Sequence, residues 1–476
     1  MEVIKDKIIK TYIISMEVEM LSTFCIGSGE SNKYDIEVVK LPNGMPYIPF
    51  TAWMGALKHY FYDAVDFSKI NKKEDILALH YFWGDSTNYL PPNFKTKIEK
   101  EDIPQSHFVP EADFGSFMSN TSLNFRDGIL LDNNKQVLNK YDFETVEAGA
   151  IMKFVCKLDI RENVEEEILQ KCLHFIENNL KNVTIGAKTN SGLGKQKLKK
   201  FECFKFDFNY ETHQKAWFRY LYDGTLADSL KENSTFEGFE LINKDTFTIS
   251  TILTLEDTLL NGGGIDLKLE TDKQPYKNKK GELLLRGETW KGAIRAKMKQ
   301  IGYAMLSDEK TTNGLIDKLF GFVSEDPNDN KKQKGRISAN ESIIENANTF
   351  VHHRVAIDHF TGGTKDGAKY DAEVIQHKDE QIKLSFSITN YEAHEPIWLL
   401  RAVIDLLLGD IAIGADAGIG RGRMKGNSIY IIDKKETIKL ELNKPNFGLQ
   451  NGNLNRINTL QTQFIKKFKN QTNATN

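Results

Sequence analysis

Two aspartates, Asp35 and Asp272, have the sequence context of residues that could do chemistry. Each stands nine positions before a glycine in closely similar segments. A carboxylate in a polar loop can accept a proton from a reacting hydroxyl group or help to hold a divalent cation. Asp266 competes with Asp272, because the second Gly-rich turn is longer by two residues. The plain alternative is a solvated or helix-capping role, which most loop aspartates have.

The segments around these aspartates belong to an internal repeat. At an offset of 237 positions, PYIPFTAWMGALK aligns with LLLRGETWKGAIR, and the register continues without a gap to Gly84 and Gly321. LNKYDFETV then resembles GAKYDAEVI, and IGAKTNSGLGK matches IGADAGIGRGR, at offsets of 229 and 228. Three blocks in the same order predict two copies of one globular domain.

The repeat divides the chain into four parts. We expect a first domain over 1–207, a linker with a docked helix over 208–244, a second domain over 245–435 and a polar tail over 436–476 that is partly disordered near its end. The net charge of −3 does not favour a free-standing nucleic-acid binder with a strong overall field. With no C-x-x-C pair among four cysteines, we expect neither a disulfide framework nor a zinc site. With neither a membrane-length apolar run nor a signal-peptide pattern, we expect a cytoplasmic protein without membrane contact.

Each copy has the same order of predicted elements. An alternating strand leads through a Gly-rich turn to the Trp-x-Gly-Ala helix, and a polar insertion follows. A second strand, an amphipathic helix, the Gly-rich loop and a last strand complete the copy. This order predicts an α+β protein of two tandem ferredoxin-like domains. The free face of such a four-stranded sheet is a common platform for RNA.

The sequence resembles the RAMP superfamily of CRISPR-associated proteins, and within it the repeated backbone subunits of type III effector complexes. The resemblance rests on DIEVVKLPNGMPYIPFTAWMGALK (35–58), on HHRVAIDHFTGGTKDGAKYDAEVI (352–375), which resembles the family's thumb hairpin, and on the G-x-G-[KR] loop seen twice. Two such domains in one chain resemble the fused double subunits of some type III variants. The resemblance implies binding to a CRISPR guide RNA, to complementary target RNA and to other subunits of the complex.

The resemblance also implies roles for particular residues. Asp35 and Asp272 would cleave target RNA and hold a divalent metal ion, which we expect to be Mg²⁺. Basic and hydroxyl residues at the helix starts, Gly-rich loops and thumb would bind RNA. This predicted RNA-binding set is Thr51, Lys58, Lys188, Lys195, Lys291, Arg295, His353, Arg354, Arg421 and Arg423. The first copy departs from the family pattern, with Met54 and Phe50 where lysine and glycine are usual.

Three other functions remain open. The chain could be a non-catalytic guide-RNA scaffold, as the lost motif in the first copy favours for that half. It could be a guide-precursor processing endoribonuclease in which His353 or His359 acts as acid or base. It could also be a tandem ferredoxin-like protein that binds small ligands and no RNA.

Overall fold

We describe the protein from a computed structural model, which divides into two compact units. Unit 1 is Met1–Ala187 with Leu193–Asn243, and unit 2 is Lys188–Gly192 with Lys244–Asn476. The structure describes residues 7–29, 35–70, 72–84, 107–110, 117–119, 123–131, 137–162, 164–232, 238–242, 244–263, 271, 273–278, 280–323, 332–376, 380–434, 436–443, 446–451 and 454–472.

The sheet of unit 1 is built around β1 (Ile8–Met20). This strand pairs antiparallel with β8 (Ile151–Arg161) on one side and with β9 (Gln196–Asp207) on the other. The strand order is β10-β9-β1-β8-β4, and β5 also pairs with β8. The outer strands are β10 (Lys231–Glu232), β4 (Phe108–Pro110) and β5 (Phe117–Ser119).

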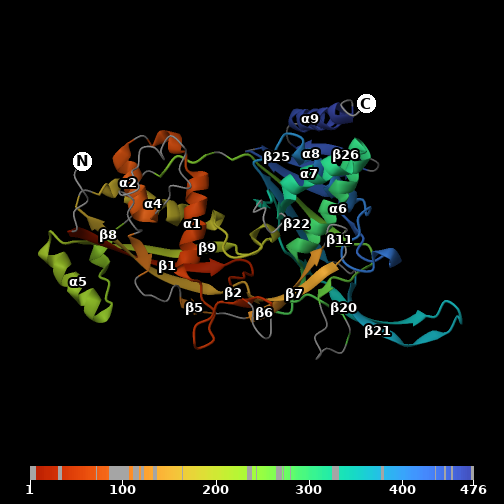
Figure 1. Cartoon of the computed structure of the whole chain (residues 1–476), viewed down its shortest axis with the longest axis horizontal. Helices are drawn as coiled ribbons and strands as arrows, with labels where there is room; N and C mark the ends of the chain where they lie inside the picture. Colours follow the sequence, from red (N-terminus) through yellow and green to blue (C-terminus); the bar gives the residue numbers. More distant parts are fainter. Residues whose placement is uncertain are drawn as a thin grey trace. The chain divides into compact units, whose positions relative to one another are not determined.

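Three helices cover one face of this sheet (Figure 1). They are α1 (Phe50–Ala64), α2 (Lys73–Trp83) and α4 (Glu166–Asn179). Alternate β1 side chains such as Tyr12 and Ile14 point into the core under the helices, as expected for a strand with period two. Trp53 of the Trp-x-Gly-Ala motif is buried there and stacks on Phe154 at 4.5 Å between ring centroids. The motif tryptophan therefore ties α1 to the sheet.

The other face of the sheet carries α5 (Glu211–Asp223), the helix expected in the linker. Ile13 and Phe206 pack there against Trp217 and its neighbours. Figure 1 shows α5 on the side of β1 and β8 away from α1, α2 and α4. The backbone N–H of Asp207 donates to Nδ1 of His213, which joins the end of β9 to α5. Part of the sheet face that was predicted to be free is therefore covered.

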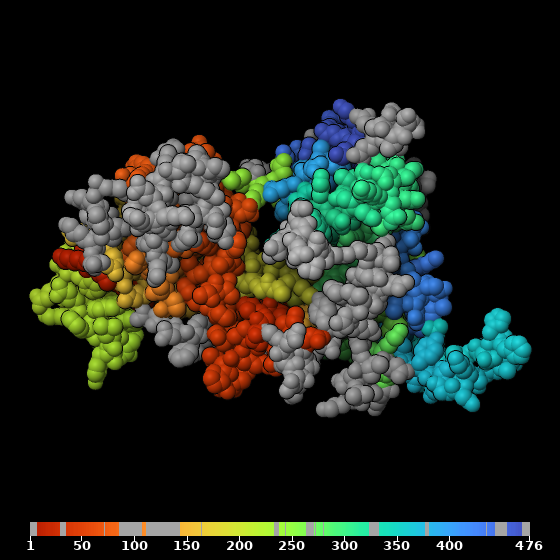
Figure 2. Space-filling view, in the orientation of Figure 1, coloured from red at the N-terminus to blue at the C-terminus, as the bar shows by residue number. Residues whose placement is uncertain are grey.

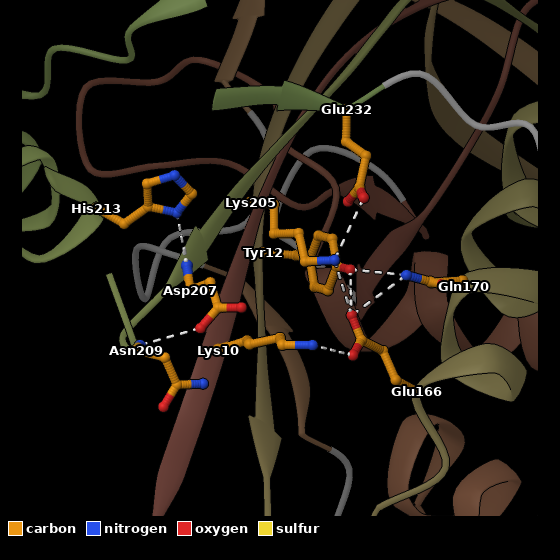
Figure 3. A network of polar contacts seen from close by, with 9 residues as sticks. All are labelled: Lys10, Tyr12, Glu166, Gln170, Lys205, Asp207, Asn209, His213 and Glu232. Carbon is orange, nitrogen blue, oxygen red and sulfur yellow. Dashed lines mark hydrogen bonds and ion pairs between the residues drawn. The ribbon is translucent and has the colours of Figure 1, made fainter. Parts of the chain in front are cut away.

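A polar network joins strands β1, β9 and β10 of the same sheet to α4 (Figure 3). Glu166 accepts hydrogen bonds from Lys10 at 2.5 Å and from the Tyr12 hydroxyl at 2.6 Å, and Lys205 lies 3.1 Å from it. Lys205 also donates to Glu232 of β10 at 3.3 Å. Burial of the ring and the bond to Glu166 raise the pKa of Tyr12. We assign this network to the fold, because it bridges β1, β9, β10 and α4.

Unit 2 repeats the architecture around β11 (Thr246–Leu255). This strand lies between β22 (Gln381–Thr389) and β24 (Ser428–Asp433), antiparallel to both. The helices are α6 (Gly287–Leu306), α7 (Glu309–Phe320) and α8 (Glu395–Leu407). The core again holds the motif tryptophan, Trp290, whose Nε1 donates to the Ser342 hydroxyl at 3.0 Å.

The polar composition of 436–476 predicted a tail outside the second domain, but residues 436–443, 446–451 and 454–472 are folded as part of unit 2. They form β25 (Glu436–Asn443), β26 (Asn446–Asn451) and α9 (Leu454–Thr472). The apolar residues Ile457, Leu460, Phe464 and Phe468 recur at helical spacing among Asn, Gln and Lys, and all four are buried in the unit 2 core. The two strands extend the sheet to the order β15-β19-β22-β11-β24-β25-β26.

A long hairpin leaves each sheet after the motif helix. In unit 1 it is β6 (Leu123–Leu131) with β7 (Val137–Val146), and in unit 2 it is β20 (Asn348–Ile357) with β21 (Thr364–Gln376). Figure 2 shows the tip of β20–β21 standing clear of the body of unit 2.

The remaining strands are short: β2 (Gly27–Gly29), β3 (Glu37–Val38), β12 (Thr258–Leu259), β13 (Gly262–Gly263), β14 (Gln274–Pro275), β15 (Leu283–Leu285), β16 (Gly321–Val323), β17 (Lys332–Lys334), β18 (Ile337–Ala339), β19 (Ser342–Glu345) and β23 (Met424–Lys425).

The Gly-rich loops show the repeat at the level of single backbone bonds. Ile185 N donates to Gly194 O at 3.0 Å, and Ile413 N donates to Gly422 O at 2.9 Å. Gly194 and Gly422 have φ of 75° and 76°. A Cβ on Gly422 would lie 1.8 Å from the Ile413 carbonyl oxygen. Only glycine fits this left-handed, closely approached position.

Gly422→Ala should therefore lower the free energy of unfolding by more than about 2 kcal/mol, since a methyl group must displace the backbone of Ile413. Gly292→Ala, in the interior of α6 with nothing within 4 Å of its Cβ, should instead stabilise by about 0.5–1 kcal/mol. Urea unfolding followed by circular dichroism compares the two. Equal effects would contradict the close approach.

Candidate nucleic-acid interface and active site

The loop that carries Asp35 is fixed to the second strand of the unit 1 hairpin. Asp35 itself is exposed. The next residue, Ile36, forms a parallel bridge with Phe143 of β7, and Glu144 N donates to Ile36 O at 2.9 Å. The Glu144 carboxylate in turn accepts from Val38 N at 3.1 Å. Both the backbone and the side chain of Glu144 therefore hold this segment.

The Glu144 carboxylate is buried and is paired with Lys40. Only 3% of its side chain is exposed, and Lys40 Nζ lies 2.9 Å from Oε1 and 2.8 Å from Oε2. A buried carboxylate is costly unless it is paired and hydrogen-bonded. Partial burial alone would lower the pKa of Lys40, but the hydrogen bond and charge of Glu144 outweigh it and raise the pKa. Lys40 is therefore held in its charged form.

Unit 2 has the same anchorage. Lys273 forms a parallel bridge with Ala372 of β21, and Glu373 N donates to Lys273 O at 2.9 Å. Lys277 Nζ donates to the Glu373 carboxylate at 2.9 Å. The predicted catalytic Asp272 and its competitor Asp266 lie outside the described residues.

One donor differs between the two units. Pro275 occupies the position of Val38 and has no N–H to give. In its place the Thr349 hydroxyl, from the first strand of the hairpin, donates to Glu373 at 2.6 Å. Burial would raise the pKa of Glu373, but the bonds from Thr349 and Lys277 together lower it.

The predicted residues near the helix starts lie on α1 and α6. Lys291 is partly buried, and this burial is the main cause that lowers its pKa. Arg295 is half-exposed and pairs with Asp317 at 2.9 Å. On α1, Thr51 is exposed and Lys58 Nζ donates to the Trp83 carbonyl at 3.0 Å.

Phe50 fills the position that Gly287 has in unit 2. Its ring packs against Trp53 and Phe108 at about 6 Å between centroids. The start of α1 is therefore bulkier and more apolar than the start of α6, as the departure from the family pattern implies.

The predicted cations of the Gly-rich loops have different surroundings. In unit 2, Lys188 Nζ lies 3.8 Å from the Glu288 carboxylate. Burial lowers the pKa of Lys195. Arg423 is exposed, whereas Arg421 is only 3% exposed.

Arg421 belongs to a cluster that joins the Gly-rich loop of unit 2 to the hairpin. Its guanidinium contacts His352 Nδ1 and lies 3.8 Å from Asp416, which also accepts from Arg354 at 2.8 Å. Arg354 further lies over the Tyr370 ring at 5.3 Å. Arg354 and Arg421 were expected to contact RNA, and in this structure they link the loop to the middle of β20.

The outer part of the β20–β21 hairpin is exposed. His353 Nδ1 lies 2.8 Å from the Asp371 carboxylate, with 64% of its side chain accessible. Phe360, at the turn, is 99% exposed. Ile357 and Val355 of the same hairpin are 68% and 44% exposed, so the tip presents several apolar side chains to solvent and is a candidate contact surface.

The four residues of the two Lys–Glu pairs were not predicted as functional. Lys40 and Lys277 align in the repeat, as do Glu144 and Glu373 beside the KYD motif, so a signal was present in the sequence. Within the described ranges no three His, Cys, Asp or Glu residues come together as a metal site. Likewise, no helix in the described part of the chain is long and apolar enough to span a membrane.

Comparison with known proteins identifies the family. The RAMP superfamily model matches residues 17–197 and 251–425, so the chain belongs to the RAMP superfamily and contains two RAMP regions. No curated protein matches. Among solved structures, the chain is similar to one in the cryo-EM structure of the type III-B Cmr-beta complex bound to cognate target RNA. Identity is 13% and the TM-score is 0.31, over 40% of this chain and 62% of the other.

Lys277→Met should raise the pKa of Glu373. Burial raises this pKa, and after the change only the Thr349 hydroxyl remains of the two donors that lower it. Since the wild-type pKa is lowered, the stability from Glu373 is present above the ordinary glutamate pKa of about 4.3 and is lost as pH falls through the lowered value. Titration of ¹³C-glutamate-labelled protein, assigned with Glu373→Gln, measures the shift. Lys280→Met, at an exposed neighbouring lysine, should leave the pKa unchanged; an equal shift would contradict the pairing.

Proposed function

We propose that this chain is a guide-RNA-binding backbone subunit of a type III CRISPR effector complex and that it cleaves complementary target RNA at loop aspartates. Membership of the RAMP superfamily supports this class of protein. The observation that carries the proposal is the exposed Asp35, which begins a segment anchored to the root of a hairpin by backbone contacts that unit 2 repeats.

We further infer that each unit is a ferredoxin-like domain with an inserted thumb. The antiparallel orders β9-β1-β8-β4 and β24-β11-β22-β18, with helices on one face, support this fold. The thumbs are the hairpins β6–β7 and β20–β21. The exposed Phe360 ring is suited to stack on a base, and His353 and Lys369 nearby are suited to the backbone of RNA.

In the proposed reaction the 2′-hydroxyl of a splayed nucleotide attacks the adjacent phosphorus in line. The P–O5′ bond breaks, which leaves a 2′,3′-cyclic phosphate, and the departing 5′-oxygen takes a proton from water. Asp35 accepts or positions the proton of this hydroxyl, and the anchored loop supplies the geometry. Mg²⁺ usually takes one or two carboxylates together with substrate phosphates and water. The single exposed carboxylate of Asp35 fits such a site with RNA, and the ion would relieve charge on the phosphate.

The His353–Asp371 pair supports a second candidate function, processing of a guide-RNA precursor. A carboxylate at 2.8 Å from Nδ1 orients an imidazole for acid–base work, as a guide-precursor processing ribonuclease requires. Metal-independent cleavage of CRISPR repeat RNA that is lost in His353→Ala would support it. Unchanged repeat RNA after incubation with the wild-type chain would exclude it.

Asp35→Ala and Asp272→Ala, made separately in the assembled complex, should each abolish one distinct cleavage product. Loss of the proton acceptor or metal ligand should slow that product by at least about a hundredfold. Denaturing gels of end-labelled target RNA, run with and without Mg²⁺, measure both sites at once.

Asp35→Asn and bound guide RNA are the controls for this experiment. The amide variant should fold and retain guide RNA while losing its product. An unchanged product pattern with guide RNA still bound would contradict catalysis and leave the chain as a guide-RNA scaffold.

Lys291→Met should weaken guide-RNA binding by about fivefold to tenfold and reduce the slope of log affinity against log salt by about one. A phosphate at the start of α6 would favour the charged lysine that burial disfavours. Lys299→Met, on the same helix but paired with Glu309 at 3.2 Å, is the matched control. Equal effects of the two changes would count against a phosphate contact at Lys291.

A further inference from the structure

We infer that the pairs Lys40–Glu144 and Lys277–Glu373 are positioning pairs that set each aspartate loop against the root of its hairpin. This inference rests on the proposed function, because it concerns the placement of the proposed cleavage loops. The glutamates act through the segment that they hold and are not catalytic residues.

The geometry of the contact separates this role from ordinary surface pairing. Glu144 holds the segment after Asp35 in three ways: through its backbone N–H to Ile36 O, through its carboxylate to Val38 N, and through the ion pair with Lys40. The contacts span the residues directly after Asp35, so a shift of the glutamate moves the loop. An exposed ion pair would contribute little, but here the carboxylate is 3% exposed.

The two units reach the same arrangement with different donors. Val38 N is replaced by the Thr349 hydroxyl, which comes from another strand, yet the Lys–Glu pair and the backbone bond are present in both. In unit 1, if the buried Glu144 served only the core, an apolar side chain would fill its place at lower cost. The paired charges therefore point to a requirement for a fixed loop position.

The arrangement also links the hairpin to the loop. Glu144 lies on β7 and Glu373 on β21, the returning strands of the two hairpins. A hairpin that engages RNA then carries the aspartate loop with it. We expect loss of the pair to reduce the rate of the cleavage step more than RNA affinity, because a displacement of about 1 Å at a reacting group can cost a hundredfold.

The test uses the assembled complex, where each unit controls for the other. Lys40→Met should lower kcat for the product assigned to Asp35 by about tenfold to a hundredfold, with KM, guide RNA and the other product unchanged. Lys277→Met should do the same for the second product. Lys40→Arg should retain most of the rate, because a guanidinium can still donate to the Glu144 carboxylate. Lys69→Met, which removes an exposed pair with Glu240 at 3.8 Å, should change neither product.

Hydrogen exchange supplies a readout that does not depend on cleavage. Lys40→Met should speed exchange at the Val38 and Glu144 amides without a change in the β1 amides. Unchanged exchange, or an equal fall of both products, would overturn the positioning role. If Asp35→Ala leaves cleavage intact, the proposed function fails instead, and faster exchange at these two amides still supports the pair as the anchor of the loop.

Discussion

A paired glutamate at the root of each hairpin, fully buried in unit 1 and partly buried in unit 2, is the constraint on which the rest of the site depends. A carboxylate that is withdrawn from water must find donors, and Glu144 finds them in one short segment, at Val38 N and Lys40 Nζ. Satisfying one buried charge thus orders the segment that begins at Asp35, and the bond from Glu144 N to Ile36 O fixes its register. Placement of the proposed catalytic group follows from a local electrostatic requirement.

Comparison of the two units separates what the fold requires from what each unit can vary. The Gly-rich loops share their backbone bonds and their left-handed glycines almost bond for bond, because the close approach leaves no alternative to glycine. Side-chain donors are replaceable, as Thr349 in place of Val38 N illustrates. The start of the motif helix differs most, with Phe50 packed on Trp53 where unit 2 has Gly287. In the proposed function the two units therefore need not bind RNA equally, although they share a scaffold.

The repeat, the α+β class and the tryptophan-centred helices could be predicted from the sequence, since periodicity and aligned glycines carry that information. The folded C-terminal segment was missed because four apolar residues, such as Phe464 and Phe468, are spread among polar ones and their helical spacing is easily hidden by composition. Asp35 was predicted from its motif, but its anchor was not. Glu144 is more than a hundred positions from Lys40 in sequence, and no local pattern predicts a pair across that distance.

Several of the cations predicted to bind RNA already form ion pairs with carboxylates of the protein. Arg354 and Arg421 share Asp416, and Arg295 faces Asp317. A phosphate of bound RNA must compete with these carboxylates, so such arginines would contribute less to RNA affinity than their number implies. The carboxylates nevertheless hold the arginine side chains in fixed positions. Lys291, whose charge burial disfavours, gains more from an incoming phosphate than an arginine already neutralised by Asp416. The chain has a net charge of −3, so in the proposed function a few desolvated or exposed cations on a pre-ordered surface would recognise RNA. Weak overall electrostatic attraction is compatible with precise placement of the RNA strand at the anchored loops.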